Sequence, residues 1–293
     1  MLLIPKLTRT LVFGNIFVAA CAYFLTLEEL YFDGKLALLN PSSLFVFFST
    51  LLIYNYRKLF FADRELSPPV TERAKWIVSN RSTLAIICLT SVFGILISAF
   101  NLSGKTLLLL LPLFFISVLY ATPFSTKMDS AKRLRFLPYV KIFLVAGVWS
   151  TVTVLFPVVE NDSEMLFSNA VIFSFITRFI FLFAITLPFD IRDIEVDARN
   201  KIKTIPLALG EKNTVRLALA ALVLFMGMYG FSFLFMENQN RYKAIGYILS
   251  GICSFALISQ SSKNKNEYFT SFWIEGLMLL QFICLFLMKI FTI

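Results

Sequence analysis

Residues 165–189, MLFSNAVIFSFITRFIFLFAITLPF, form the apolar stretch that decides the fold of this chain. Arg178 is the one charged residue in it, and the run is long enough for a helix to cross a hydrocarbon core of about 30 Å. Inside such a core the backbone must satisfy its own hydrogen bonds, which a single segment does as a helix. The stretch therefore predicts a membrane-spanning helix.

The rest of the chain has the same character. Hydrophobic residues make up 58% of the sequence, with 34 Phe, and charged residues only 15%, which is far more apolar than a soluble domain. Runs of about 20 apolar residues indicate further spans. The predicted fold class is all-α, a polytopic membrane bundle of nine transmembrane helices. The spans fall near residues 11–31, 41–61, 82–100, 105–122, 138–159, 165–189, 214–235, 242–262 and 270–292.

We expect one membrane domain over residues 1–293, built from two four-helix blocks at about 1–135 and 136–265 and a ninth helix. The two longest polar connections, 61–81 and 190–213, each follow the second span of a block. Two polar clusters at the same depth, facing each other across one cavity, are therefore predicted.

The distribution of Lys and Arg predicts the orientation. Most of them lie before the first span or in the connections after every second span, and such residues are retained in the cytoplasm. The amino terminus is therefore expected in the cytoplasm and the carboxyl terminus outside, in an integral protein of a bacterial inner membrane. Topology and anionic membrane lipid account for the net charge of +9, without nucleic acid, because the basic residues form no binding stripe.

A cluster of charge, DIRDIEVDARN at 190–200, follows the opening stretch directly. Asp190, Asp193 and Asp197 are spaced i, i+3, i+7, so they share one face if the helix continues past Pro188. Three anions on one face repel each other, and carboxylate oxygens suit Mg²⁺. The spacing therefore favours a metal site; the alternative is a solvated cytoplasmic connection.

Basic residues accompany these aspartates and extend the interpretation. Arg192 lies among them and Lys203 follows in the same connection, and both offer charge-assisted hydrogen bonds to phosphate oxygens. The two kinds of charge together predict a metal-assisted diphosphate site at the membrane surface.

The pattern D-x-x-D-x-x-x-D followed by K-T-x-P-x-x-x-G resembles the second aspartate-rich motif of the UbiA superfamily of intramembrane prenyltransferases. Its second half is Lys203, Thr204, Pro206 and Gly210 here. The resemblance implies a bundle around a central cavity, in which Mg²⁺ holds a prenyl diphosphate between two such motifs. Lys127, after the fourth span, and Lys141, entering the fifth, are weaker echoes of the family and further candidates for binding the diphosphate.

The first aspartate-rich motif departs from the family pattern. Asn55 and Asp63 match its outer positions and are the remaining candidate catalytic and metal-binding residues, but Leu59 occupies the middle position and cannot bind a metal. Arg57 and Lys58 lie in the same turn and are expected to bring positive charge to the diphosphate in place of a second Mg²⁺. The alternative is that both are ordinary positive-inside anchors.

The favoured function is a Mg²⁺-dependent intramembrane prenyltransferase that moves an isoprenoid chain from a prenyl diphosphate to an aromatic or other lipophilic acceptor. Two alternatives stay open: a terpene cyclase with the same ionisation step, and a non-catalytic isoprenoid-binding protein, which Leu59 favours. A transporter is disfavoured because polar groups gather at the cytoplasmic ends of spans. The exceptions inside spans, Arg178 and Glu275, are expected to pair with each other or with another polar group in a structural role.

Overall fold

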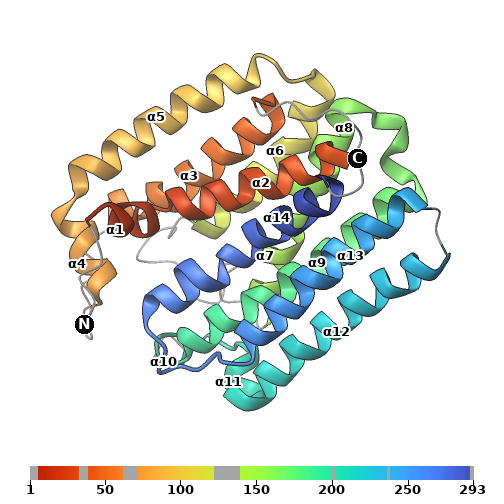
Figure 1. The fold of residues 1–293 in the computed structure, drawn as a ribbon. Coiled ribbons are helices and arrows are strands. Elements are labelled where there is room, and N and C mark those ends of the chain that lie inside the picture. Colours follow the sequence, from red (N-terminus) through yellow and green to blue (C-terminus); the bar gives the residue numbers. More distant parts are fainter. Residues whose placement is uncertain are drawn as a thin grey trace.

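The computed structural model describes residues 6–32, 39–61, 71–121, 139–199, 202–235 and 238–290. Every regular element within these ranges is a helix (Figure 1), which confirms the all-α prediction. Asp63 and Lys127 of the predicted site lie outside the described residues.

The helices follow one another along the whole chain. They are, in order, α1 (Lys6–Phe13), α2 (Ile16–Phe32), α3 (Pro41–Phe61), α4 (Glu72–Ser79), α5 (Arg81–Ala99), α6 (Gly104–Ala121), α7 (Val140–Ser150), η4 (Thr151–Leu155), α8 (Phe156–Asn161), η5 (Ser163–Phe167), α9 (Asn169–Arg192), α10 (Ile194–Arg199), α11 (Ile205–Leu209), α12 (Glu211–Phe235), α13 (Asn238–Ile258), η6 (Phe269–Ile274) and α14 (Gly276–Ile290). Each of the nine predicted spans overlaps at least one of them.

The predicted span positions agree with the helices better than the predicted number of spans does. Within the described ranges, five helical segments are both long and apolar enough to cross a membrane, or six if the bent pair α1–α2 is one span. The predicted count of nine is therefore not confirmed. One reason is α6, whose described apolar part, Gly104–Ser117, is shorter than a span requires.

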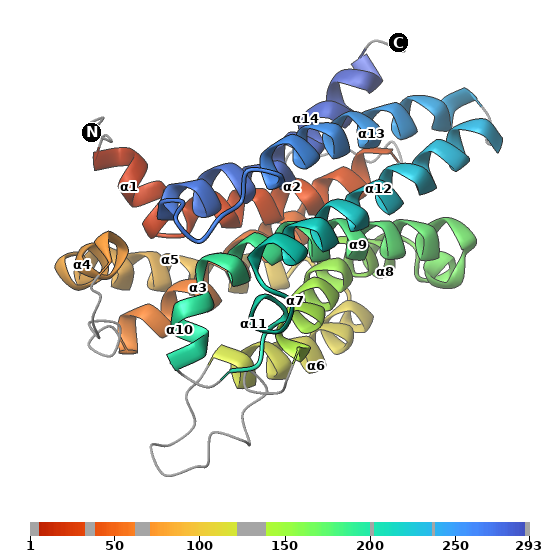
Figure 2. The ribbon, with the colours of Figure 1, turned by 90° about the horizontal axis from the view of Figure 1, so that it is seen from below.

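The first and last long helices lie side by side. α2 packs against α14, α14 against α13, α13 against α12, α12 against α9 and α9 against α7, while α3 packs on the other side of α2. The same neighbours can be followed in Figures 1 and 2. In this arrangement the middle of the bundle is surrounded by α2, α3, α7, α9 and α14.

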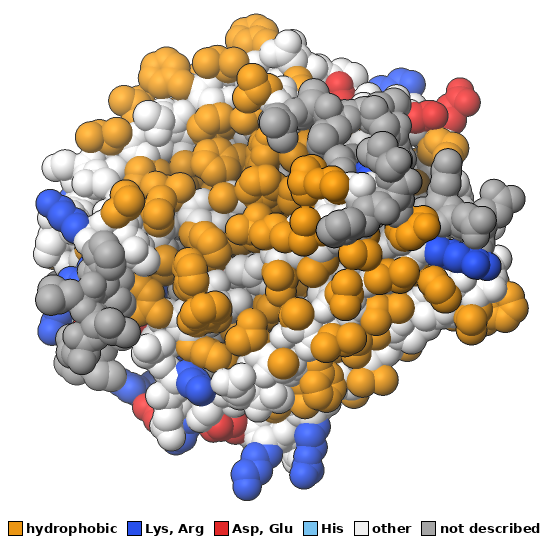
Figure 3. Space-filling model, in the orientation of Figure 1, with side chains coloured by type: hydrophobic (Ala, Val, Ile, Leu, Met, Phe, Trp, Pro, Cys, Tyr) orange, Lys and Arg blue, Asp and Glu red, His pale blue; other side chains and the backbone are white. Residues whose placement is uncertain are grey.

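Burial explains why the bundle holds together. Leu25, Phe181, Leu222, Phe225 and Leu285, from four different helices, have no exposed surface and belong to one core cluster. Outward-facing positions are apolar too: Figure 3 shows hydrophobic side chains across the middle of one face and most Lys and Arg toward its rim. A surface of this composition suits lipid around the middle and water at the ends.

A sharp break separates α1 from α2 at the polar end of the bundle. The two helices are bent by 59°, and Asn15 at the break has a positive φ of 57°. Asn tolerates this left-handed conformation better than most residues. At Gly14 a Cβ atom would lie 2.5 Å from the carbonyl oxygen of Thr10, so the break requires glycine there.

Candidate active site

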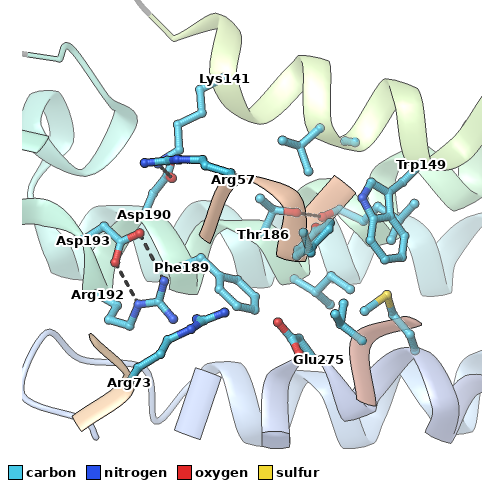
Figure 4. A pocket seen from close by; sticks show the side chains of 17 residues that line it. Arg57, Arg73, Lys141, Trp149, Thr186, Phe189, Asp190, Arg192, Asp193 and Glu275 are labelled. Carbon is cyan, nitrogen blue, oxygen red and sulfur yellow. Dashed lines mark hydrogen bonds and ion pairs between the residues drawn. The ribbon is translucent and has the colours of Figure 1, made fainter. Parts of the chain in front are cut away.

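A cavity of about 230 Å³ lies between α2, α3, α7, α9 and α14, with the start of α4 at its edge. One end is charged and the other is apolar, and Figure 4 shows Trp149 on the side away from Arg192 and Asp193. The charged lining residues are Arg57, Arg73, Lys141, Asp190, Arg192, Asp193 and Glu275. The apolar wall includes Val145, Ala146, Trp149, Leu182, Ile185 and Met278. The cavity is thus shaped for a ligand with an anionic head and a hydrocarbon body.

Asp190 and Asp197 converge on one lysine. The Lys141 Nζ lies 2.6 Å from Asp190 Oδ1 and 3.3 Å from Asp197 Oδ2. Both aspartates are buried, at 2% and 0% exposure. Helix α9 continues through Pro188 to Arg192, and α10 begins at Ile194 after a break at Asp193. The carboxylates of Asp190 and Asp197 come together, but the three aspartates do not share one continuous helical face as their spacing predicts. Lys141, which resembles the family pattern only weakly in sequence, therefore lies at the centre of the site.

Asp193 has a different partner from the other two aspartates. It forms a forked ion pair with Arg192, with Nε 2.8 Å from Oδ1 and Nη2 3.1 Å from Oδ2. The same guanidinium donates from Nη1 to Thr270 Oγ1 at 2.9 Å and lies 5.3 Å from the centre of the Phe189 ring. Arg192 is therefore held in a fixed plane at the cavity wall, where a planar guanidinium binds phosphate well.

Asn55, Arg57 and Lys58, the described site candidates from the first-motif segment, have different surroundings. Arg57 lines the cavity, as the phosphate interpretation predicts. Asn55 is fully buried outside the cavity wall, and its Nδ2 donates to the carbonyl oxygens of Gly14 and Leu51, each at 2.8 Å. The structure thus uses the Asn55 amide on the break between α1 and α2, not at the cavity, because that break leaves carbonyl oxygens without helical partners.

Lys58 also serves the helix break. Its Nζ donates to Asn15 Oδ1 at 2.9 Å and to the Phe13 carbonyl oxygen at 3.3 Å, and the residue is only 8% exposed. Neighbouring residues of a helix point about 100° apart, so Arg57 and Lys58 face different surroundings. Lys58 does not line the cavity wall with Arg57.

Lys203 lies apart from this cavity. Its side chain is exposed, while its carbonyl oxygen accepts a hydrogen bond from the Tyr139 backbone N–H at 3.0 Å. That bond ties the segment after α10 to the start of α7. The backbone of Lys203 therefore helps to place Lys141, two residues beyond Tyr139.

Two charged residues of the cavity wall, Arg73 and Glu275, were not predicted as site residues from the sequence. Arg73 lines the cavity from α4 and donates from Nη2 to Asn15 Oδ1 at 2.9 Å. Glu275, expected to be structural, faces the guanidinium groups of Arg73 and Arg192 (Figure 4). Little in the sequence distinguishes them: Arg73 is one of several basic residues in a polar connection, and Glu275 is a single acidic residue in a predicted span.

The second intraspan charge, Arg178, has a partner from the first span rather than Glu275. Its Nη2 lies 2.5 Å from Glu28 Oε1, and the Tyr247 hydroxyl donates to the same oxygen at 2.6 Å. Arg178 Nη1 also donates to the Leu25 carbonyl oxygen at 3.3 Å. The expected structural role fits this closed arrangement.

The sequence model of the UbiA prenyltransferase family matches residues 74–285 of the chain. This chain belongs to the UbiA prenyltransferase family. A search among curated proteins finds no significant match. Together with its long apolar helices, the family membership identifies the chain as an integral membrane protein.

Solved structures share the fold over nearly the whole chain. A UbiA homologue from Archaeoglobus fulgidus bound to GPP and Mg²⁺ is 14% identical, with a TM-score of 0.64, and the match covers 96% of this chain and 99% of that one. The same homologue bound to DMAPP and Mg²⁺ gives a TM-score of 0.62 at 14% identity, covering 96% and 98%. A digeranylgeranylglyceryl phosphate synthase gives 0.55 at 14% identity, also covering 96% and 98%. At this identity the match demonstrates a shared fold.

A divalent cation fits the aspartate side of this UbiA-family site. Asp197 Oδ1 is buried and accepts no hydrogen bond from the described residues, and Asp190 lies close by on the same lysine. The described residues contain no ready-made group of three metal-binding side chains. Mg²⁺ commonly takes one or two protein carboxylates and completes its shell with water and phosphate oxygens. The donor set therefore suits a cation that arrives with its phosphate.

Proposed function

We propose that this chain is a Mg²⁺-dependent intramembrane prenyltransferase, which transfers an isoprenoid chain from a prenyl diphosphate to an aromatic or other lipophilic acceptor. The observation that carries the proposal is the two-ended cavity, in which buried carboxylates and guanidinium groups lie at one end and apolar side chains at the other. A diphosphate matches the first end and a hydrocarbon chain the second.

The charged end would hold the diphosphate in two ways. Asp190 and Asp197, with Asp193 nearby, supply oxygen ligands for Mg²⁺, which stabilises negative charge on a leaving diphosphate. Arg57 and Arg192 donate hydrogen bonds to phosphate oxygens. Lys141 lies between the two buried carboxylates and holds them in place. Strong binding of the diphosphate favours ionisation because the charge develops on its bridging oxygen.

The transfer itself divides into bond breaking and bond making. The bond between the first prenyl carbon and the diphosphate oxygen breaks, and its electron pair leaves with the diphosphate. The allylic cation that remains is stabilised by the aromatic face of Phe189, which lines the cavity next to Asp190. A nucleophilic carbon or oxygen of the acceptor then bonds to the cation and releases a proton.

The degenerate first motif points to a site with one Mg²⁺ and extra guanidinium groups. Leu59 packs in a small apolar cluster with Ile77 and Leu84, so it contributes nothing polar. Asn55 is committed to the helix break, whereas Arg57 and Arg73 reach the cavity. Asp63 stays a predicted ligand. In our proposal the guanidinium groups supply the positive charge that a second Mg²⁺ would otherwise bring.

The orientation and organisation proposed from the sequence complete this scheme. We place the charged end of the cavity, the amino terminus and the basic connections in the cytoplasm, where soluble prenyl diphosphates and Mg²⁺ are available, and the carboxyl terminus outside. The protein would act in a bacterial inner membrane as one domain of two related four-helix blocks. The apolar end of the cavity then lies deeper in the bilayer.

The test is a turnover assay with purified protein. Radiolabelled geranyl, farnesyl and geranylgeranyl diphosphates are incubated with and without Mg²⁺ and with a panel of aromatic acceptors, and Asp190→Ala is the control. We expect Mg²⁺-dependent diphosphate release and a prenylated acceptor from the wild type and neither from the variant. Release with a cyclic hydrocarbon and no acceptor would identify a cyclase, and no release from any substrate would identify a non-catalytic binder.

A further inference from the structure

A second cavity lies beyond the apolar end of the first. It measures about 150 Å³ and is lined by α2, α3, α6 and the α7–η4 segment. Most of its wall is apolar, including Ala22, Phe45, Val46, Ile53, Leu113 and Val152. The two cavities have Tyr54 and Trp149 in common as lining residues. These two side chains therefore form the partition between them.

The partition is an aromatic pair held from two helices. The rings of Tyr54, on α3, and Trp149, on α7, have centroids 6.5 Å apart and an interplanar angle of 84°. This edge-to-face arrangement is a favourable one for aromatic rings. The carbonyl oxygen of Trp149 accepts a hydrogen bond at 2.8 Å from Thr153 Oγ1, within the π-helical turn η4 that walls the second cavity. The pair thus has a defined geometry.

We infer that Tyr54 and Trp149 limit the length of the isoprenoid chain, so that the natural donor is a prenyl diphosphate of few isoprene units. This inference rests on the proposed function. With its diphosphate fixed beside Asp190, the chain runs along the apolar wall toward Trp149 (Figure 4) and ends against the aromatic pair. Opening the partition adds the second cavity's space to the path of the chain.

The chemistry of the second cavity favours hydrocarbon as its occupant. None of the described side chains that line it is charged, and its polar groups are the hydroxyls of Ser49, Thr50, Tyr54, Ser117 and Thr153 and the indole N–H of Trp149. A polar or charged acceptor would lose hydration there with little compensation. Terminal isoprene units carry no polar group, so their transfer into this space is favourable.

The experiment measures the binding of donors of increasing length to the full-length protein in nanodiscs. Thiolodiphosphate analogues of dimethylallyl, geranyl, farnesyl and geranylgeranyl diphosphate, which ionise slowly, are titrated with Mg²⁺ by calorimetry. In the wild type we expect the affinity to rise with length and then fall where the chain meets the partition. In Tyr54→Ala that maximum should move by at least one isoprene unit, with tightening of about tenfold or more for the longer analogue.

Two further variants make the test specific. Tyr56→Ala is the matched control, because Tyr56 lies on the same helix but is 37% exposed and packs against Phe60 outside both cavities. It should keep the wild-type length preference. Ser49→Phe, added to Tyr54→Ala, places a ring in the second cavity and should restore the wild-type maximum.

The possible outcomes separate this inference from the proposed function. If Tyr54→Ala binds the analogues with the wild-type length preference, the partition does not set the limit, although the protein still binds prenyl diphosphates. If all lengths gain affinity equally, or the gain survives Ser49→Phe, the second cavity holds another ligand such as a lipid chain, and the inference is overturned. Binding of no analogue by the wild type would instead contradict the function. Trp149→Leu gives the same test if Tyr54→Ala fails to fold.

Discussion

Arg178 and Asp190 lie on the same helix, about 18 Å apart along its axis, yet their surroundings differ in kind. Around Arg178 the polar atoms are directed at one another: Glu28 Oε1 receives both the guanidinium and the Tyr247 hydroxyl, and all three residues are at most 2% exposed. Around Asp190 the charged side chains line a cavity. A charge closed off by protein partners maintains the fold, whereas a charge that faces a cavity is available to a ligand.

The largest expected effect is on the cavity side of this comparison. Asp190→Asn keeps the size of the side chain but removes its negative charge, so the rate of diphosphate release should fall about a thousandfold while the melting temperature changes little. The measurement is single-turnover release of labelled diphosphate at saturating Mg²⁺. Glu195→Gln, in the same connection but with a side chain 65% exposed, is the matched control and should retain the wild-type rate. A wild-type rate in Asp190→Asn would remove this aspartate from the site.

Substitution in the buried cluster of Arg178, Glu28 and Tyr247 should lower stability and leave turnover nearly unchanged. Arg178→Met leaves Glu28 buried without its cation, which should destabilise the protein by about 3–5 kcal/mol. The unfolding midpoint in detergent measures this loss, and release per folded molecule should stay near the wild-type rate. A second substitution, Glu28→Leu, removes the stranded charge and should recover most of the stability. A selective loss of turnover in stable Arg178→Met would show that this cluster acts on the reaction.

Arg57 and Lys58 are neighbours on α3, but Arg57 lines the cavity and Lys58 binds the helix break. Arg57→Ala should weaken the binding of inorganic pyrophosphate about thirtyfold and raise the Mg²⁺ concentration needed for turnover, because the cavity loses a phosphate donor. Lys58→Ala, the matched variant, should mainly lower the unfolding midpoint, since Lys58 holds the helix break. Calorimetric titration of both proteins gives the affinities. Equal pyrophosphate affinities in the wild type and Arg57→Ala would contradict the hypothesis that guanidinium groups replace a second Mg²⁺.

The smallest effect is expected at Asn55. Asn55→Ala leaves the Gly14 carbonyl oxygen without its donor and should cost about 1–3 kcal/mol of stability. The Mg²⁺ dependence of diphosphate release should be unchanged, because the amide lies outside the cavity wall. A Mg²⁺ titration of turnover checks this directly. A clear increase in the Mg²⁺ requirement would return Asn55 to the metal site that the family motif predicts for it.

Sequence reasoning anticipated the proximity of Asp190 and Asp197 better than the positions of the first-motif residues. Asp190 and Asp197 are seven residues apart in two successive helices, α9 and α10, and the short break at Asp193 still leaves their carboxylates close together. Asn55, Lys58 and Arg73 depend on where the break between α1 and α2 lies, and all three bind Asn15 or its neighbouring backbone. A contact between residues 40 or more positions apart leaves no trace in local spacing.

What the sequence by itself determined is the membrane, the helices and the carboxylate pattern, because hydrophobic length and helical periodicity are local properties. Tertiary structure alone decided which charged side chains line the cavity. It paired Arg178 with Glu28, turned Asn55 toward the helix break, and brought Glu275 and Arg73 to the cavity wall. Those outcomes follow from how the helices pack around one another, and packing depends on the whole bundle rather than on any one segment.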